Sequence, residues 1–208
     1  MKPRRDWYIF DLDGTLYDFW WVWFSDSLLG QAVRERYYDI ISHFSLWEPE
    51  SYYRYMVERE RSENIGISLQ VATLLWIPRK EVLQTVWWNI DPEKVVKNFS
   101  VSQNILRELY ELWKLLFLVT AAPSVWATHA WEYMHIRAYF TSILTLEDFV
   151  SSKKEAFTKI SHSSGIPFEN LISIGDQMHS DIIPAEELSM QTLHVRWPQD
   201  LIPLLAYE

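Results

Sequence analysis

Short apolar runs alternate with amphipathic segments along much of this 208-residue chain. The runs end at polar residues or glycine, as expected for buried strands of a parallel sheet. They lie at residues 7–10, 115–119, 142–146, 171–174 and 192–195. Helical periodicity fills the intervals between the later runs, at residues 101–113, 124–136 and 153–164. Strands that alternate with helices predict an α/β fold with a Rossmann-like, doubly wound parallel sheet.

Residues 18–98 interrupt this alternation. They carry helical periodicity and no convincing strand, with Pro49 and Pro78 at expected helix starts and Gly66 at a break between helices. We therefore expect an α/β core formed by residues 1–17 and 99–208, with an inserted all-α domain at 18–98.

Aromatic residues are abundant, with 12 Trp, 11 Tyr and 10 Phe. Those in the later part of the insertion are expected to pack in its core: Trp76, Trp87 and Trp88. The run FWWVWF at 19–24 has two interpretations. Its side chains pack the helices of the insertion together, or one of three tryptophans contacts a ligand: Trp20, Trp21 or Trp23.

Composition excludes several functional classes. The formal net charge of −9 disfavours binding to a nucleic-acid backbone. The absence of cysteine excludes disulfides, zinc–thiolate sites and a cysteine nucleophile. The first apolar stretch stops at Asp11, and no apolar run approaches the roughly 20 residues of a membrane span. We expect a cytoplasmic protein with neither nucleic-acid nor membrane partners, and the sequence leaves its oligomeric state open.

Polar residues follow three of the predicted strands. Asp11 and Asp13 come after the first strand, Thr120 ends the second, and Asp176 follows the fourth, with Asp181 five residues later. The carboxyl ends of parallel strands open on one edge of the sheet, where ligands bind. Clustered carboxylates repel one another unless a cation lies between them, and a hard cation such as Mg²⁺ prefers oxygen ligands. Because Mg²⁺ commonly completes its shell with phosphate oxygens, the pattern indicates phosphate chemistry.

Four sequence motifs in fixed order resemble the haloacid dehalogenase (HAD) superfamily, most of whose members are phosphatases. They are DLDGT at 11–15, LVTAAP around Thr120, SSKKEAF with its two lysines, and IGDQMHSD with Asp176 and Asp181. The resemblance covers the first 18 residues and most of 100–196, but does not extend in detail to the insertion.

The resemblance implies roles for four aspartates. Asp11 would be the nucleophile that forms an aspartyl-phosphate. Asp13 would be the general acid and base, with its backbone carbonyl also binding the metal. Asp176 would be the third metal ligand, together with Asp11 and Asp13. Asp181 would orient metal-bound water or the lysine.

The resemblance also implies a phosphate-binding set. The hydroxyl of Thr120 and the amide of Ala121 would hold phosphate oxygens, although many family members carry Asn or Ser after the threonine. Lys153 would neutralise charge in the transition state, with Lys154 as the alternative assignment.

Together these features predict a Mg²⁺-dependent phosphatase that acts on a small phosphorylated metabolite, with the insertion as a cap that closes over the site. A phosphomutase shares the same residues and remains an alternative. A non-catalytic binding protein with a vestigial site is a third possibility. The metabolite itself is open among sugar phosphates, nucleoside monophosphates and phosphoglycolate.

Overall fold

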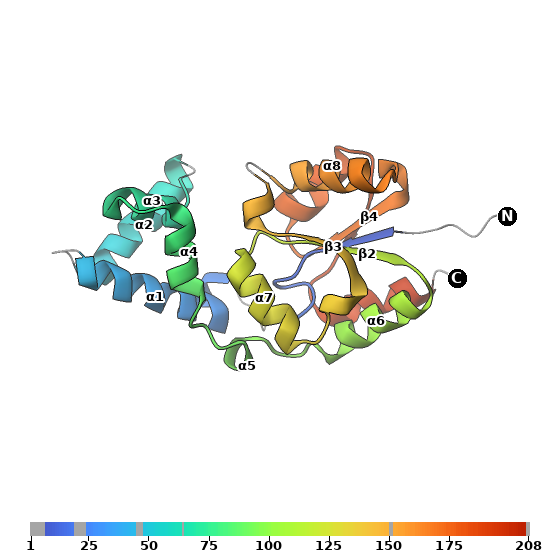
Figure 1. Ribbon diagram of the computed structural model, residues 1–208, viewed down its shortest axis with the longest axis horizontal. Helices are drawn as coiled ribbons and strands as arrows, with labels where there is room; N and C mark the ends of the chain where they lie inside the picture. The colour runs from blue at the N-terminus through green and yellow to red at the C-terminus, as the bar shows by residue number, and fades with distance from the viewer. Residues whose placement is uncertain (1–6, 19–23, 45–47, 64, 150–151, 207–208) are drawn as a thin grey trace. The chain divides into compact units, whose positions relative to one another are not determined.

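The computed structural model describes residues 7–18, 24–44, 48–63, 65–149 and 152–206 (Figure 1). The chain divides into two compact units. One comprises Met1–Trp21 and Pro92–Glu208, and the other comprises Val22–Asp91. Among the described residues, no helix is both long and apolar enough to cross a bilayer.

The first unit is built on a sheet of five parallel strands in the order β3-β2-β1-β4-β5. The strands are β1 (Trp7–Phe10), β2 (Leu115–Val119), β3 (Phe140–Leu144), β4 (Leu171–Gly175) and β5 (Gln191–His194). The predicted α/β fold with a parallel sheet is thereby confirmed.

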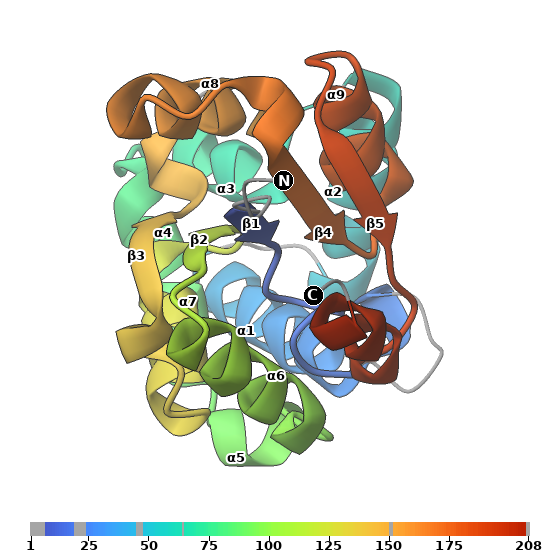
Figure 2. The same ribbon diagram turned by 90° about the vertical axis from the view of Figure 1, so that its right-hand side faces the viewer.

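Helices cover both faces of the sheet. The α-helices are α5 (Pro92–Val95), α6 (Ser100–Glu111), α7 (Ser124–Tyr133), α8 (Lys153–Ser164) and α9 (Ile183–Glu186). The 3₁₀-helical segments are η2 (Arg137–Tyr139), η3 (Leu146–Asp148), η4 (Phe168–Asn170) and η6 (Pro198–Ala206), and η5 (Met178–Ile182) is a π-helical turn. Figure 2 shows α8 and α9 on one face, and α6 and α7 on the other.

Alternation along the strands explains the two packed faces. Ile9 and Phe117 pack with Phe157 of α8 in one buried cluster. Tyr8 and Phe10 point to the opposite face, where the Phe10 ring meets Phe140 edge-on at 6.3 Å between centroids. Because successive strand residues point to opposite faces, β1 contributes to both layers and is apolar throughout.

Several predicted boundaries were wrong by a few residues. The third strand occupies Phe140–Leu144 rather than 142–146, because Thr145 begins a capping box with Asp148 and the chain turns there. The fifth strand is shifted by one residue. The helices predicted to end at residues 113 and 136 end at Glu111 and Tyr133. Trp113 and His135 then adopt left-handed conformations, with φ of 59° and 54°, and such a residue stops a helix.

The described residues of the second unit form helices without a strand: η1 (Phe24–Asp26), α1 (Leu28–Phe44), α2 (Pro49–Glu63), α3 (Ile67–Leu75) and α4 (Arg79–Trp87). Of the three later tryptophans predicted to lie in its core, the prediction is confirmed for Trp87 and wrong for Trp76 and Trp88. Trp87 is buried, but Trp76 and Trp88 are 94% and 57% exposed. Both lie just past the end of a helix, and Trp76 has a left-handed backbone. The boundary of a cap at 18–98, and its closing motion, stay predictions.

Candidate active site

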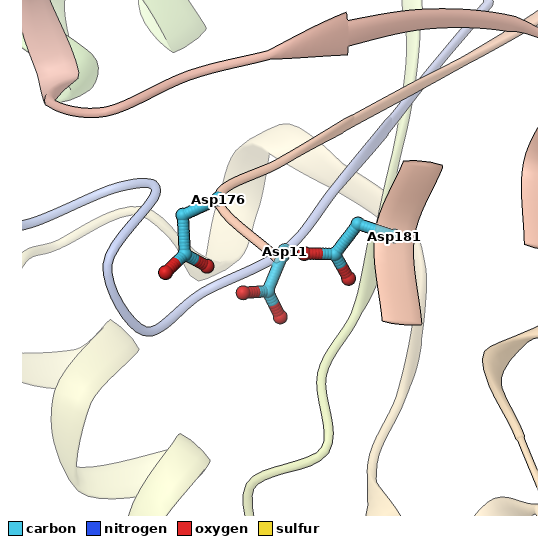
Figure 3. A group of neighbouring side chains, drawn as sticks. All are labelled: Asp11, Asp176 and Asp181. Atoms are coloured by element: carbon cyan, nitrogen blue, oxygen red, sulfur yellow. The ribbon is translucent and has the colours of Figure 1, made fainter. Parts of the chain in front are cut away.

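The site lies at the carboxyl edge of the sheet, where β1, β2 and β4 end. Asp11 directly follows β1, and its amide donates to the carbonyl of Ile174 in β4 at 2.9 Å. Carboxylate oxygens of Asp11, Asp176 and Asp181 lie within 4.8 Å of one another. Figure 3 shows the carboxyl groups of Asp176 and Asp181 on either side of Asp11. The parallel topology thus brings Asp11 together with residues that lie 165 and 170 positions later in the sequence.

Lys153 is the cation of this cluster. It is the first residue of α8, and its Nζ lies 2.5 Å from Oδ1 of Asp11 and 2.6 Å from Oδ1 of Asp181. The lysine is only 4% exposed. Its neighbour Lys154 instead pairs with Glu187 at 2.8 Å on the surface. Of the two candidate lysines, the structure brings Lys153 to the aspartates and leaves Lys154 outside.

The Asp181 carboxyl group accepts three hydrogen bonds. Its Oδ1 accepts from Lys153 and from the Ser180 hydroxyl at 3.2 Å, and its Oδ2 accepts from the Gln177 amide at 2.9 Å. A β-carbon on Gly175 would lie 2.3 Å from the Asp181 carboxyl group, so only glycine fits there. Asp181 is therefore equipped to hold Lys153 rather than to ligate an ion.

The Asp176 carboxyl group accepts fewer hydrogen bonds from the described residues than that of Asp181. Its Oδ2 accepts from the Gln177 side chain at 2.9 Å, whereas its buried Oδ1 has no hydrogen-bond partner among the described residues. Gly14, with φ of 80°, packs so closely that a β-carbon would lie 2.6 Å from Oδ2. A buried carboxylate oxygen without a donor is costly unless a cation binds it. Asp11 and Asp176 thus fit a hard divalent cation such as Mg²⁺.

Asp13 has separate partners from Asp11, although the two aspartates are two residues apart. Its Oδ1 accepts hydrogen bonds from the hydroxyl of Tyr17 and from Nε1 of Trp126, the latter at 3.0 Å. Sequence reasoning missed both donors. Tyr17 lies two residues after the first motif and carried no signal that separated it from core aromatics. Trp126 lies 113 residues away from Asp13, on α7.

Thr120 and Ala121 follow β2 at the same edge. The Thr120 hydroxyl is buried and accepts a hydrogen bond from the Ala122 amide at 3.0 Å. The Thr120 amide donates to Leu144 at the end of β3 at 3.0 Å, which fixes the turn. Ala121 is exposed beside it.

The three tryptophans considered for ligand contact, Trp20, Trp21 and Trp23, lie outside the described residues.

Burial dominates the electrostatics of the site. Burial raises the pKa of Asp11 well above its usual value, with Lys153 opposing the shift and Asp181 reinforcing it. Burial, reinforced by the charge of Asp181, raises the pKa of Asp176 to about 6. Burial alone would lower the pKa of Lys153, but attraction to Asp11 and Asp181 raises it, so the lysine stays charged. The charge of Lys153 does not balance the carboxyl groups around it, as expected for a site that binds a further cation.

Asp13 and Tyr17 form a second interacting pair, in which Tyr17 is fully buried. Burial raises the pKa of Asp13, partly offset by the hydrogen bonds from Tyr17 and Trp126. Burial, and then the charge of Asp13, raise the pKa of Tyr17 well above its usual value. Tyr17 therefore keeps its proton and acts as a donor to Asp13.

Comparison with known protein families shows to which family the chain belongs. Residues 8–195 match the family described as haloacid dehalogenase-like hydrolase. The chain belongs to this family. It is therefore a HAD-family hydrolase, and the resemblance in the four motifs is confirmed. No curated protein matches the sequence significantly.

Solved structures of other HAD proteins share the fold. A HAD phosphatase from Thermococcus onnurineus has a TM-score of 0.72 at 16% identity, covering 98% of this chain and 99% of its own. A protein from Haemophilus somnus, described as a predicted phosphoglycolate phosphatase, has a TM-score of 0.65 at 13% identity, with 99% of each chain covered. A Bacillus subtilis protein described as the putative HAD-hydrolase YfnB, bound to magnesium, has a TM-score of 0.62 at 16% identity, covering 98% of this chain and 99% of its own.

Proposed function

We propose that this HAD-family hydrolase is a Mg²⁺-dependent phosphatase that cleaves a small phosphate monoester through an aspartyl-phosphate on Asp11. One observation carries the proposal. Carboxylate oxygens of Asp11, Asp176 and Asp181 lie within 4.8 Å of one another, and the buried Oδ1 of Asp176 has no donor among the described residues. Lys153 is buried in contact with Asp11 and Asp181. This arrangement suits a trianionic centre at phosphorus that needs cations on several sides.

Asp11 is the proposed nucleophile. Lys153 occupies its Oδ1, and no described residue donates to its Oδ2, which leaves that oxygen for attack on phosphorus. Attack would form the Asp11–phosphorus bond as the bond to the leaving alcohol breaks. Water would then displace Asp11 and release inorganic phosphate.

Two further groups would bind the transferred phosphoryl oxygens. The Thr120 hydroxyl accepts from the Ala122 amide, so its own proton is left to donate to a phosphate oxygen. Lys153 would stabilise the charge that develops during transfer, because its buried position gives it a fixed orientation before the substrate arrives. The Ala121 amide is the proposed second donor.

Asp11 and Asp176 would hold Mg²⁺ through their side chains, and Asp13 through its backbone carbonyl. Bound there, the ion would offset the carboxylate charge and draw the phosphate group toward Asp11. The magnesium bound to the Bacillus subtilis relative supports this choice of cation.

The substrate is proposed as a small phosphorylated metabolite. Sugar phosphates, nucleoside monophosphates and phosphoglycolate remain the classes to screen. The Haemophilus somnus relative, described as a predicted phosphoglycolate phosphatase, places phosphoglycolate early in that screen.

The proposal is tested by following phosphate release from p-nitrophenyl phosphate and a panel of metabolite monoesters, with Mg²⁺ and with chelator. Asp11→Asn removes the nucleophile, and Asp39→Asn, an exposed aspartate of α1, is the matched control. We expect Mg²⁺-dependent release that Asp11→Asn abolishes and Asp39→Asn preserves. Release that persists in Asp11→Asn, or no release from any monoester, would overturn the proposal. Isomerised sugar phosphate in place of inorganic phosphate would indicate a mutase.

A further inference from the structure

Both hydrogen-bond donors to the Asp13 side chain converge on one oxygen. The hydroxyl of Tyr17 and Nε1 of Trp126 each donate to Oδ1. A carboxylate oxygen has two lone-pair positions, so these two donors saturate it. In the part of the chain that the structure describes, nothing donates to Oδ2. The two oxygens of Asp13 are therefore chemically unequal.

The two donors reach Asp13 from different parts of the first unit. Tyr17 lies four residues after Asp13, and the backbones of the two residues form a β-bridge outside the named strands. Trp126 comes from α7, the helix that follows the Thr120 turn. Both side chains have 0% exposure, so neither ring can swing away without repacking the core. An indole N–H can only donate, which fixes the direction of that bond.

We propose that Tyr17 and Trp126 are positioning residues that orient Asp13 so that Oδ2 is the atom that gives and takes the catalytic proton. This inference rests on the proposed function, in which Asp13 is the general acid and base. It adds a stated atom and two residues that the four motifs do not assign.

The proton balance follows from this arrangement. As the phosphorus bond to the leaving oxygen breaks, that oxygen takes the proton from Oδ2, and Asp13 becomes a carboxylate. In the second half, Oδ2 accepts a proton from water as the water oxygen bonds to phosphorus and the Asp11–phosphorus bond breaks. Each turnover therefore returns the proton to the oxygen from which it came.

A purely structural role for the two rings predicts different kinetics. Loss of packing would lower stability and reduce all activity by one common factor. Loss of acid positioning would matter most when the leaving group is a poor one that needs the proton, and least for nitrophenolate, which leaves readily without it. The leaving-group dependence of kcat/KM thus separates the two roles.

The kinetic test uses the full chain with Tyr17→Phe, Trp126→Phe and the double variant. Each is assayed with phenyl phosphate and p-nitrophenyl phosphate. We expect kcat/KM for phenyl phosphate to fall by on the order of 10- to 100-fold, with a clearly smaller loss for p-nitrophenyl phosphate and little change in KM. Tyr37→Phe and Trp87→Phe make the same replacements at buried positions of the second unit and should leave both values unchanged. Equal losses for the two substrates would overturn the inference.

A second measurement does not depend on activity. The indole N–H resonance of Trp126 is identified by its disappearance in Trp126→Phe, and its shift is then compared between the wild type and Asp13→Asn. We expect Asp13→Asn to move this resonance, since it removes the charged acceptor. An unmoved resonance would overturn the contact and the inference. If it moves but the wild type hydrolyses no phosphate ester, then the proposed function fails, and the catalytic role of the pair fails with it.

Discussion

Nζ of Lys153 lies 2.5 Å from Oδ1 of Asp11, and both side chains are buried. The same nitrogen also lies 2.6 Å from Oδ1 of Asp181. The lysine therefore balances two buried carboxylates, and its charge is fixed beside the carboxyl group proposed to attack phosphorus. This relationship links the stability of the site to its chemistry.

Replacement of Lys153 should damage both properties. Lys153→Met leaves Asp11 and Asp181 buried without their cation, so we expect a loss of about 3 kcal/mol in the free energy of unfolding. We also expect kcat to fall on the order of 10²- to 10³-fold, as when one preorganised charge stabiliser is removed. Lys154→Met, which removes only a surface partner of Glu187, is the control. Equal activity in the two variants would contradict the assignment of Lys153.

Gly175 offers a test of how tightly Asp181 is held. In Gly175→Ala the new β-carbon would lie 2.3 Å from the Asp181 carboxyl group, so that side chain must move and release Lys153. We expect a loss of roughly 1–3 kcal/mol in unfolding free energy and a large drop in kcat.

Gly165→Ala is the matched control for this change. Gly165 has φ of 69° and no heavy atom near its added β-carbon, so it should lose about 1 kcal/mol through backbone strain alone. Activity, measured at a temperature where both variants are folded, should fall only in Gly175→Ala. Full activity in Gly175→Ala would show that the position of Asp181 is unimportant.

Thr120 should act on substrate binding through its hydroxyl. Thr120→Val keeps the shape of the side chain but removes both the acceptor for the Ala122 amide and the donor proposed for phosphate. We expect kcat/KM to fall on the order of 10-fold or more, corresponding to at least one lost hydrogen bond to a charged group. Thr120→Ser restores the hydroxyl and should recover most of the activity. Failure of serine to rescue would point to packing rather than phosphate binding.

Magnesium should stabilise the protein in a pH-dependent way. Burial raises the pKa of Asp176 to about 6 from its usual value near 3.8, so the metal-free folded chain binds more protons than the unfolded chain between these values. Its free energy of unfolding should therefore fall as pH rises from about 4 to 6. Asp11 shifts in the same direction. Mg²⁺ binds the deprotonated carboxylates, so it should counter this loss above pH 6.

Thermal unfolding with and without Mg²⁺ measures this effect. We expect the rise in Tm to be larger at about pH 7.5 than at about pH 5, because protons compete with the ion at the lower pH. Asp176→Asn should abolish the rise at both values. A rise of the same size at the two pH values, or one that survives in Asp176→Asn, would place the ion elsewhere.

The sheet and the convergence of the aspartates were predictable from sequence for a physical reason. Buried parallel strands are apolar on both faces, so they stand out as continuous runs, and their carboxyl ends must share one edge. Asp11, Thr120 and Asp176 follow such runs directly. The helix ends at Glu111 and Tyr133 were not predictable, because Trp113 and His135, two residues beyond them, take left-handed conformations usually reserved for glycine.

The preference for Lys153 over Lys154 has a further basis in the sequence. Lys153, Ala156, Phe157 and Ile160 recur at helical spacing and are all buried in α8, so the apolar periodicity already assigned Lys153 to the inner face. The contact between Trp126 and Asp13 carried no such signal. It depends on how α7 packs beside the first motif, which no local spacing encodes.

The central claim is that Asp11 becomes phosphorylated. The most direct test is to mix Asp13→Asn protein with Mg²⁺ and p-nitrophenyl phosphate, quench in acid, and map the modified peptide by mass spectrometry. Asp13→Asn should slow hydrolysis of the intermediate more than its formation, because nitrophenolate leaves without an acid. The account predicts one phosphoryl group on Asp11, absent in the Asp11→Asn, Asp13→Asn double variant. Turnover of the ester with no phosphoryl group on Asp11, or with one on another residue, would contradict it.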